Sequence, residues 1–519
     1  MSKLMTGGQM RDAEKAAIRT GKVTGATLMQ RAGQGVFDAI SKRWPDLAMR
    51  RGTRALILCG PGNNGGDGFV VACLLASAGW SVDVALLGDP ARLPPDAAAN
   101  HAKWVDGGRH PVWPLADVAG LIGRDGGHDL MVDALFGTGL SRAVAEDVMQ
   151  VLRLAIGRAG HSVAIDILSG LCADSGRWLG ADAGLSVDLT VTFHIARPGH
   201  VLSAGATATR ALRIVDIGLP APSASQNDTL AQLIDSSGDV ASVAHKDPAA
   251  HKFGSGHALV LSGGAGRTGA ARLAARAALR IGAGLVTLGV PPAAQQEVAC
   301  QITALMLARV PDAPALVALL HDHRLSALCL GPGLGIGART RALVVAALQA
   351  DRAVVLDADA LTSFSDDPEA LFDLSRGTRT VLTPHGGEFA RLFPDLAERL
   401  AATPATGPAW SRLDAVQAAS ARAGCTVLLK GADTVIAAPD APVHVHAACR
   451  GRAAPWLATA GAGDVLAGLI TGLLARGQAP LDAAARAAWL HVECARHVGP
   501  GLIAEDLPEA LPGVLRALI

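Results

Sequence analysis

Short apolar runs alternate with longer helix-like segments along most of the chain, and glycine or proline separates them. A short run of aliphatic and β-branched residues between turn residues is typical of a strand buried on both faces. In the first half, this pattern predicts strands within 54–60, 81–88, 128–137, 162–168, 189–194 and 211–218. Because strands alternate with helical patterns, we predict a doubly wound parallel sheet.

The alternation is lost between 219 and about 245, where Pro, Ser and Asp become frequent, as in a linker. It then resumes, with strands predicted within 257–264, 284–291, 327–333, 352–360, 379–388 and 426–438. A length of 519 residues favours two or three domains. We therefore predict an α/β chain with a first domain over 1–220, a linker over 221–245 and a second domain over 246–519.

Composition limits the binding partners and the cellular compartment that we expect for this chain. Lys plus Arg and Asp plus Glu both number 46, so no long-range field favours nucleic acid or an anionic membrane. The eight cysteines form no C-x-x-C pair, which argues against a zinc site or a disulfide framework. The N-terminus lacks an apolar signal core, and no stretch approaches a membrane span of about 20 apolar residues. We expect a cytoplasmic homo-oligomer.

The loop GPGNNGGDG at 60–68 lies between a predicted strand and a predicted helix. A helix N-terminus presents free N–H groups and a positive dipole, which suit a phosphate. The glycine spacing matches neither the dinucleotide fingerprint nor the P-loop. Asn63, Asn64 and Asp67 add oxygens suited to a hard cation or to ribose hydroxyls. A glycine turn with an Asn cap is the simpler alternative.

Polar residues follow three other strands of the first domain, where open α/β sheets bind ligands. They are Asp133, Asp166, Ser169 and Arg197. The turn Gly137-Thr138-Gly139 is a second candidate phosphate cradle, and a carboxylate beside it attracts phosphate only through a cation. A bound cation would bring Asn64, Asp133 and Ser169 into one site. Each of them alone is more often a cap or turn residue.

The segments GPGNNGGDG, DALFGTGL at 133–140 and AIDILSGL at 164–171 resemble the epimerase domain of NAD(P)H-hydrate repair enzymes. Those domains interconvert the R and S forms of hydrated nicotinamide dinucleotides. The resemblance implies a Rossmann-like three-layer αβα domain, a potassium ion on Asn64, Asp133 and Ser169, and Asp166 as the acid/base at the nicotinamide C6. It places the substrate on Asn63, Asn64, Gly65, Gly66, Asp67, Gly137, Thr138, Gly139, Leu140, Ser141, Arg142, Ala143 and Asp166.

The chain departs from that family at two positions. Leu168 stands where the family usually has Pro, and Arg197 stands where it usually has Lys. Arginine keeps the positive charge but is a poor proton donor. If the family lysine takes part in proton transfer, a slow epimerase is expected here.

In the second domain, Gly461, Ala462 and Gly463 precede Asp464 at the start of a long apolar helix. Backbone N–H groups of such a turn form an anion hole, and the Asp can take a proton from a hydroxyl that attacks a phosphoryl group. Glycine turns at 262–269 and 331–337, the strand-end Lys430 and the TPHGGE segment at 383–388 accompany it. A helix cap, packing glycines and a surface lysine are the plain alternatives.

The GAGD turn resembles the ribokinase-like fold, and TPHGGE resembles the TPHPGE segment of ADP- or ATP-dependent NAD(P)H-hydrate dehydratases, with Gly386 in place of Pro. TGAAR at 268–272, GPGLG at 331–335, VLDADAL at 355–361 and GLIAEDLP at 501–508 also match. The resemblance implies a ribokinase-like α/β domain with Asp464 as catalytic base and Mg²⁺ as cofactor. It places the hydrated substrate on Ala270, Gly333, His385 and Asp464, and the nucleotide on Lys430, Gly431, Ala432, Asp433, Thr434 and Gly463.

Together the two halves predict a bifunctional repair enzyme for NAD(P)H hydrates. The first half supplies the S hydrate, and the second transfers a phosphoryl group from ADP to the C6 hydroxyl and eliminates phosphate, releasing AMP. ADP- and ATP-dependent types share these motifs, so both nucleotides stay open. One alternative is a small-molecule kinase, which would release a stable phosphorylated product. Another is a first domain that binds ligands without catalysing epimerisation.

Overall fold

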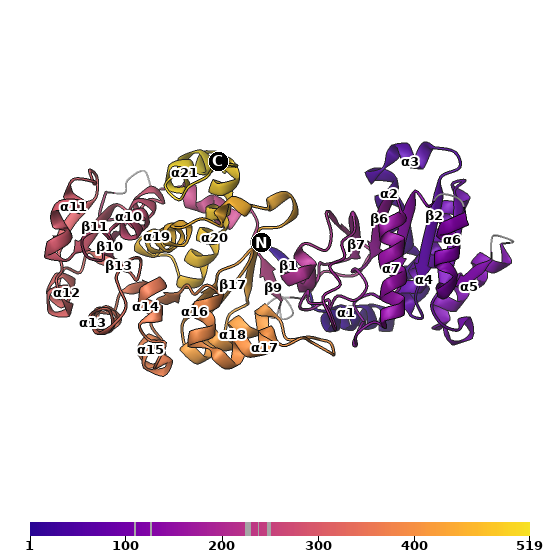
Figure 1. Cartoon of the computed structure of the whole chain (residues 1–519), viewed down its shortest axis with the longest axis horizontal. Coiled ribbons are helices and arrows are strands. Elements are labelled where there is room, and N and C mark those ends of the chain that lie inside the picture. The colour runs from indigo at the N-terminus through magenta and orange to yellow at the C-terminus, as the bar shows by residue number, and fades with distance from the viewer. Residues whose placement is uncertain (108–110, 125–126, 224–229, 237, 247–250) are drawn as a thin grey trace. The chain divides into compact units, whose positions relative to one another are not determined.

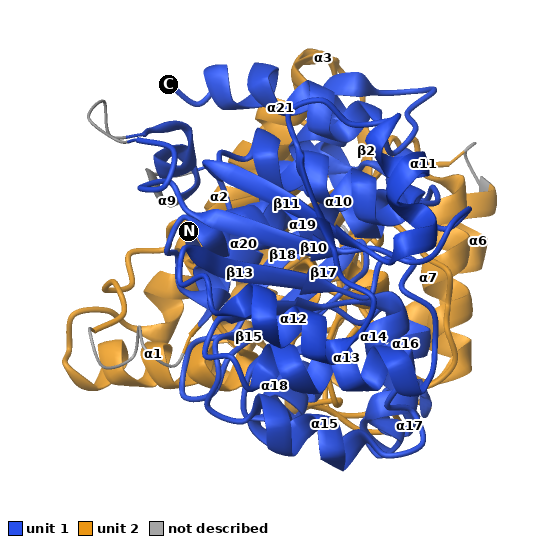
Figure 2. Cartoon of the chain, turned by 90° about the vertical axis from the view of Figure 1, so that its left-hand side faces the viewer, with its two compact units in different colours: residues 1–2, 231–402, 412–519 blue, residues 3–230, 403–411 orange. Residues whose placement is uncertain are grey.

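The computed structural model describes residues 1–107, 111–124, 127–223, 230–236, 238–246 and 251–519. The chain folds into two compact units (Figures 1 and 2). Unit 1 comprises Met1–Ser2, Ala231–Ala402 and Arg412–Ile519, and unit 2 comprises Lys3–Leu230 and Thr403–Ser411. The predicted linker 221–245 includes 224–229 and 237, which lie outside the described residues. The domain limits at 220 and 246 stay predictions.

Unit 2 is built on a seven-stranded sheet with the order β4-β3-β2-β5-β6-β7-β8, in which every neighbouring pair is parallel. The strands are β2 (Arg54–Cys59), β3 (Ser81–Leu86), β4 (Val112–Pro114), β5 (Leu130–Ala134), β6 (His161–Ile165), β7 (Leu189–Phe193) and β8 (Leu212–Val215). The doubly wound sheet is therefore confirmed. Only β4 lacks a predicted counterpart, because three residues ending in Pro are too short to show a strand period.

Helices cover both faces of this sheet. They are α1 (Gly7–Arg19), α2 (Gly25–Arg43), α3 (Pro45–Met49), α4 (Asn63–Ser77), α5 (Pro95–Asp106), α6 (Val118–Arg124) and α7 (Glu146–Arg158). Side chains alternate along β2: Ile57 packs with α2 and α4, whereas Leu56 and Leu58 pack with α6 and α7. The central strands β2, β5, β6 and β7 are buried on both faces, so they are mostly apolar.

The second sheet has the strand order β1-β9-β18-β17-β16-β15-β14-β13-β10-β11-β12, and all of its strands from β9 to β18 belong to unit 1. The strands are β1 (Ser2–Leu4), β9 (Ala231–Leu233), β10 (His257–Leu261), β11 (Leu285–Val290), β12 (Met306–Arg309), β13 (Leu325–Leu330), β14 (Ala353–Leu356), β15 (Thr380–Leu382), β16 (Thr426–Leu429), β17 (Asp433–Ala437) and β18 (His444–Ala447). From β16 to β12 the neighbouring strands are parallel.

The predicted strand over 426–438 is wrong in one respect. It forms two antiparallel strands, β16 and β17, joined at Lys430, Gly431 and Ala432. Apolar residues on both sides of the turn hide the reversal in the sequence, and only the Gly and the following Asp mark it.

The helices of unit 1 surround its sheet (Figure 1). They are α9 (Gly238–Ala241), α10 (Gly269–Arg280), α11 (Gln295–Ala299), α12 (Ala313–Leu320), α13 (Ala338–Leu348), α14 (Ala358–Thr362), α15 (Pro368–Ser375), α16 (Gly386–Leu392), α17 (Pro394–Ala401), α18 (Arg412–Ala423), α19 (Ala462–Ala475), α20 (Pro480–Val498) and α21 (Asp506–Arg516). In the part of the chain that the structure describes, none of the helices is both long and apolar enough to span a membrane.

Helix α19 packs unusually close to α10, and this contact fixes the position of its N-terminus. A β-carbon on Gly468 would lie 2.1 Å from the carbonyl oxygen of Ala274, and one on Gly472 would lie 2.6 Å from that of Ala278. Both contacts involve backbone atoms, which cannot rotate away. The glycines of α19 therefore serve helix packing.

We expect Gly468→Ala to destabilise unit 1 by roughly 1–3 kcal/mol, because the added methyl group overpacks a helix contact. Gly513→Ala in α21 is the matched control, since its β-carbon would come no closer than 3.4 Å, to the side chain of His497. That variant should be neutral or up to about 1 kcal/mol more stable, as expected for Gly to Ala in a helix. Urea denaturation measures both, and equal effects of the two changes would contradict this packing.

Candidate active sites

The first candidate site lies where β2, β5 and β6 end. Asn64 is in the first turn of α4, Gly137 follows β5, and Asp166 follows β6. A β-carbon on Gly137 would lie 2.8 Å from Oδ2 of Asp166 and 3.1 Å from Oδ1 of Asn64. The structure thus brings these three predicted residues together, and only glycine leaves room for both side chains.

Asp166 is held in a fixed orientation. Its Oδ2 accepts a hydrogen bond from the Thr138 backbone N–H at 2.8 Å, and its Oδ1 accepts one from the Thr192 hydroxyl at 3.1 Å. The backbone φ is 66°, a left-handed conformation that Asp tolerates better than most residues. Nε2 of His200 lies 2.8 Å from the Asp166 carbonyl oxygen. The carboxylate is therefore aimed before any ligand binds.

Asp133 and Ser169 form a buried pair beside this group. Oδ1 of Asp133 accepts from the Ser169 hydroxyl at 2.7 Å, and Oδ2 accepts from the Ser169 N–H at 2.8 Å. Burial raises the pKa of Asp133 to about 6, although these hydrogen bonds oppose the rise. The Phe136 N–H, next to Gly137, donates to Ser169 Oγ at 2.9 Å, which connects the pair to the Asn64 side.

Arg197 is fully buried beneath the same site. Its guanidinium donates to the Phe193 carbonyl at 2.8 Å and to the Met5 carbonyl at 3.4 Å, and it makes no ion pair with the carboxylates of the described residues. Burial lowers the pKa of Arg197, whereas the charge of Asp166 acts in the opposite sense. Arg197 is thus an electrostatic neighbour of the site held by backbone carbonyls.

Glu14 on α1 is a site neighbour that the sequence analysis missed. Burial, followed by the charge of Asp166, raises its pKa, and Arg197 acts against the rise. Burial and the charges of Asp166 and Glu14 also raise the pKa of Asp67. A glutamate in an amphipathic helix usually faces solvent, so nothing in the local sequence marks Glu14. The site therefore gathers three mutually interacting acidic side chains, Glu14, Asp67 and Asp166, and the buried Arg197 interacts with two of them, Glu14 and Asp166.

The other predicted residues of this half occupy the loops around that centre. Gly65 and Gly66 are buried in the first turn of α4, and a β-carbon on Gly65 would lie 2.0 Å from the Gly60 carbonyl oxygen. Asn63, Gly139, Ser141, Arg142 and Ala143 are exposed, and Leu140 is half-buried. Leu168, where the resemblance leads one to expect Pro, is buried in the apolar core against α7.

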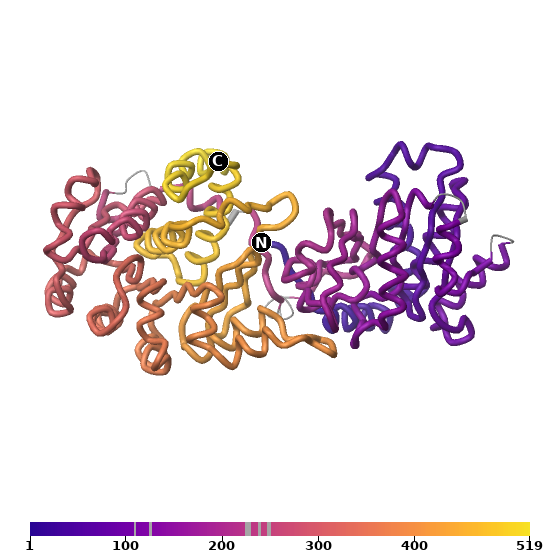
Figure 3. The backbone as a smooth tube through the Cα atoms, in the orientation of Figure 1, coloured from indigo at the N-terminus to yellow at the C-terminus, as the bar shows by residue number. Residues whose placement is uncertain are grey.

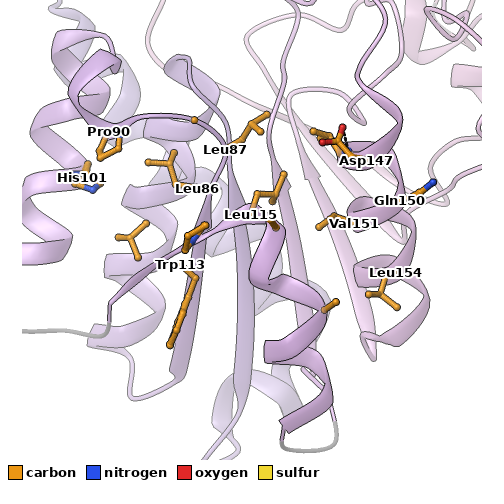
Figure 4. A pocket seen from close by; sticks show the side chains of 16 residues that line it. Leu86, Leu87, Pro90, His101, Trp113, Leu115, Asp147, Gln150, Val151 and Leu154 are labelled. Carbon is orange, nitrogen blue, oxygen red and sulfur yellow. Dashed lines mark hydrogen bonds between the residues drawn. The ribbon is translucent and has the colours of Figure 1, made fainter.

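A separate apolar hollow of about 690 Å³ lies beside the ends of β3 and β4 (Figure 4). Its walls come from Leu86, Leu87, Trp113, Leu115 and the α7 residues Val151 and Leu154, with His101 and Asp147 at the rim. None of the predicted site residues lines it.

The second candidate site lies at the carboxyl ends of β14, β15 and β16. Nζ of Lys430 donates to Oδ1 of Asp357 at 2.7 Å and lies 3.9 Å from Oε2 of Glu388. A β-carbon on Gly463 would lie 3.5 Å from the same Nζ, so Lys430 reaches the N-terminus of α19. Burial opposes the charge of Lys430, but the carboxylates of Asp357 and Glu388 outweigh it and raise the pKa of Lys430.

Asp464 lies in the first turn of α19, beside this ion pair. Burial, and then the charge of Asp357, raises the pKa of Asp464 to about 6, and Lys430 opposes the rise. A carboxylate with such a pKa is ionised near neutral pH and still basic enough to take a proton.

His385 caps α16 through Nδ1, and its other ring nitrogen, Nε2, lies 3.4 Å from Oε1 of Glu388. Nδ1 accepts from the Gly387 N–H at 2.9 Å, and the His385 N–H donates to Oε2 of Glu388 at 2.8 Å. Because Nδ1 accepts, the neutral ring carries its proton on Nε2. The side chain is 55% exposed, so it is accessible to a ligand.

Two glycine loops meet near Asp359. A β-carbon on Gly333 would lie 3.5 Å from that of Ala270, and Gly333 itself has a φ of 65°. The Gly335 N–H donates to Oδ2 of Asp359 at 2.8 Å. The predicted substrate residues Ala270 and Gly333 are therefore neighbours.

The turn between β16 and β17 is closed by the Thr434 hydroxyl, which donates to the Gly431 carbonyl at 2.8 Å. Arg412, which the sequence analysis missed, donates to the Lys430 carbonyl at 3.3 Å and lies 3.3 Å from Oδ1 of Asp433. Ala432 completes the turn. All residues predicted for the nucleotide thus lie at this turn or, in the case of Gly463, beside Lys430.

The fold and these two sites define a two-part α/β chain with a Rossmann-like sheet and a second sheet whose carboxyl edge faces a glycine-rich helix N-terminus. Family models agree with this division. The model described as YjeF-related protein N-terminus matches residues 25–199, and the model described as NAD(P)H-hydrate dehydratase matches residues 258–509.

Curated relatives extend the match to the whole chain. The bifunctional NAD(P)H-hydrate repair enzyme Nnr of Moorella thermoacetica is 36% identical, over 99% of this chain and 97% of the relative. The enzyme of the same name from Escherichia coli is 32% identical, over 98% of this chain and 92% of the relative. The chain belongs to the family of bifunctional NAD(P)H-hydrate repair enzymes. The predicted fold class, Rossmann-like and ribokinase-like, is confirmed.

A solved structure resembles the second half alone. It is the ADP/ATP-dependent NAD(P)H-hydrate dehydratase of Bacillus subtilis co-crystallized with ATP and Mg²⁺, which is 27% identical with a TM-score of 0.45. The match covers 56% of this chain and 99% of that chain.

Replacing Lys430 with Met should raise the pKa of Asp464 above about 6, because the nearest opposing cation is lost while burial and Asp357 remain. A carboxyl ¹³C titration measures the shift, with Asp464→Asn to assign the signal. Lys252→Met, at an exposed position, is the control and should leave the signal in place. An unchanged pKa in the Lys430 variant would contradict the electrostatic coupling.

Proposed function

We propose that unit 2 interconverts the R and S hydrates of NAD(P)H and that unit 1 dehydrates the S hydrate at the expense of ADP. One observation carries the proposal: the carboxyl edge of each sheet holds an aspartate placed for proton transfer. In unit 2 it is Asp166, which hydrogen bonds orient, and in unit 1 it is Asp464, whose pKa is raised to about 6. Membership of the family supports the pairing of the two reactions in one chain.

In unit 1, Asp464 takes the proton of the C6 hydroxyl as that oxygen attacks the β-phosphorus of ADP, and AMP leaves. The phosphate ester at C6 then departs with its electron pair as inorganic phosphate. Loss of the C5 proton forms the C5=C6 double bond of NAD(P)H. The turn Lys430–Thr434 and the N–H groups at Gly463 bind the nucleotide phosphates. Mg²⁺ carried by the nucleotide offsets phosphate charge.

In unit 2, Asp166 donates a proton to the C6 hydroxyl, which leaves as water, and the nicotinamide ring keeps a positive charge. Water then adds to the opposite face and returns a proton to Asp166. When ionised, Glu14 and Asp67 favour the cationic ring, although burial raises the pKa of both groups. Arg197 lies too deep to touch the substrate, and its charge opposes the rise in the pKa of Glu14.

The residues Asn64, Asp133 and Ser169 fit a potassium ion. Asp133 is a buried carboxylate with no ion-pair partner among the described residues, and the Asn64 amide nitrogen is buried without a hydrogen-bond partner there. A monovalent cation offsets the charge of Asp133 and orients the Asn64 amide by binding its oxygen. When bound, the ion supplies fixed positive charge beside the Gly137–Gly139 turn.

Two single substitutions should separate the reactions. Asp464→Asn should lower ADP-dependent NADH recovery from the S hydrate by at least about 100-fold, because the proton acceptor is lost, and leave R-to-S conversion unchanged. Asp166→Asn should do the reverse. Absorbance follows NADH recovery, and chromatography follows the two hydrates. Loss of both reactions in either variant would contradict two separate sites.

Potassium should stabilise unit 2 more at neutral than at acidic pH. The folded pKa of Asp133 lies above its ordinary value, so its contribution to stability is complete below about pH 4 and is lost as pH rises through about 6. The shift from 3.8 to about 6 corresponds to about 3 kcal/mol, which a bound cation offsets.

Thermal unfolding in KCl and in choline chloride of equal ionic strength tests this. We expect a higher unfolding temperature in KCl at about pH 8 and little difference at about pH 5, where Asp133 is largely protonated. Asp133→Asn is the control and should remove both the potassium effect and its pH dependence. An undiminished potassium effect in that variant would place the ion elsewhere.

A further inference from the structure

The segment Thr403–Ser411 belongs to unit 2, although it lies between two helices of unit 1 in the sequence. The chain leaves α17 at Ala401, runs through 403–411 and enters α18 at Arg412 (Figure 3). Pro404, Gly407 and Pro408 interrupt any helical pattern here, so the segment is extended rather than helical. Figure 2 shows it in the colour of unit 2.

This segment pairs with the loop Gly137–Ala143, which carries predicted substrate residues. Arg142 and Thr406 form an antiparallel bridge, and the Gly407 N–H donates to the Ser141 carbonyl at 3.0 Å. The Gly180 N–H donates to the Pro404 carbonyl at 2.7 Å. Backbone pairing therefore connects the segment to the outer end of the loop, at Ser141 and Arg142, and to Gly180.

Apolar packing fixes the same contact. Ala409 is buried with Cys172 and Leu179 in a small cluster that also contacts Leu140. Farther along, the carbonyl of Trp410 accepts from Nη1 of Arg177 at 3.1 Å. Because most of the Gly137–Ala143 loop is exposed on its other side, this cluster is a main anchor of its outer half.

The segment also lines a cavity of about 350 Å³ that adjoins the first site. Gly407 and Pro408 form one part of the wall, and Thr138–Ser141 form another. The remaining lining residues are Thr6, Gly8, Arg11, Cys172, Ala173 and Asp174. Hydroxyl groups, backbone amides and the cation of Arg11 suit a sugar phosphate rather than a nicotinamide ring, and the carboxylate in the lining, Asp174, already accepts a hydrogen bond from the Gly7 N–H at 2.6 Å.

We propose that 403–411 is a wall of the epimerase substrate pocket and positions the Gly137–Ala143 loop, so that the dehydratase half of the sequence completes the epimerase site. This inference rests on the epimerase function proposed for unit 2. The cavity takes the sugar phosphate part of the hydrated dinucleotide, while the reacting ring lies at Asp166. The segment thus contributes to substrate binding and takes no part in proton transfer.

Gly407→Val in the full-length chain tests the wall. A β-carbon at this position would lie 3.0 Å from the Leu140 carbonyl oxygen and 3.4 Å from the Leu179 side chain, so a branched side chain moves the segment off the loop. We expect KM for the hydrate in epimerisation to rise about tenfold, with kcat within about twofold, because binding is lost and chemistry is kept. Dehydration of the S hydrate should not change.

Ala405→Val is the matched control, since Ala405 is exposed in the same segment and is not among the residues that line the cavity. It should leave KM as in the wild type. A second variant, with 404–410 replaced by a Gly-Ser sequence of equal length, covers the case in which Gly407→Val misfolds. Hydrogen exchange of the Gly180 amide, which donates to Pro404, reports the contact without activity and should accelerate in both wall variants.

Unchanged KM in both wall variants, or exchange of Gly180 as slow as in the wild type, would overturn the proposal. A wild-type chain that does not interconvert the hydrates would instead refute the proposed function of unit 2. The two failures are therefore distinguishable in one set of measurements.

Discussion

Parallel pairing of the central strands is the constraint on which both sites depend. Because β2, β5 and β6 run in one direction, the loops that follow them meet at one edge of the sheet. Asn64 and Asp166, about a hundred residues apart in sequence, consequently flank one glycine, Gly137. The same rule in unit 1 brings Asp357 and Lys430 into hydrogen-bonding contact. A sheet with reversed central strands would scatter these groups over opposite edges.

Burying charged side chains at these sheet edges costs free energy, and the same burial shifts the pKa values on which proton transfer depends. Asp464 has a pKa of about 6 because it is partly buried near Asp357, while Lys430 keeps the group from becoming fully protonated. In unit 2 the buried cation makes no such ion pair: Arg197 lies beneath the carboxylates of the described residues and donates to the carbonyls of Phe193 and Met5. Shifted pKa values of this kind are typical of sites that transfer protons. Burial also raises the pKa of Asp133, and we propose that a bound cation, rather than a side chain, offsets its charge.

The sequence predicted most strands of both sheets and most of the residues that gather at each site. Apolar runs predicted the buried strands. The glycine-rich loops after them predicted close approaches, of side chains at Gly137 and of backbone at Gly333. The sequence did not predict Glu14 or Arg412, because a charged residue in an amphipathic helix has no local mark of its partner. Nor did it predict the pairing of 403–411 with unit 2, since long-range backbone hydrogen bonds leave no periodic signal. Residue roles, including those of Asp166 and Asp464, remain predictions that only kinetics can test.

The central claim is that one chain carries both reactions, and the most direct measurement starts from the pure R hydrate of NADPH. The wild-type chain, supplied with ADP, Mg²⁺ and K⁺, is followed by the absorbance of NADPH. We predict complete recovery at a rate well above that of spontaneous epimerisation, because unit 2 supplies the S hydrate that unit 1 consumes. Recovery that never exceeds the spontaneous rate, under conditions in which the S hydrate is dehydrated rapidly, would contradict this account.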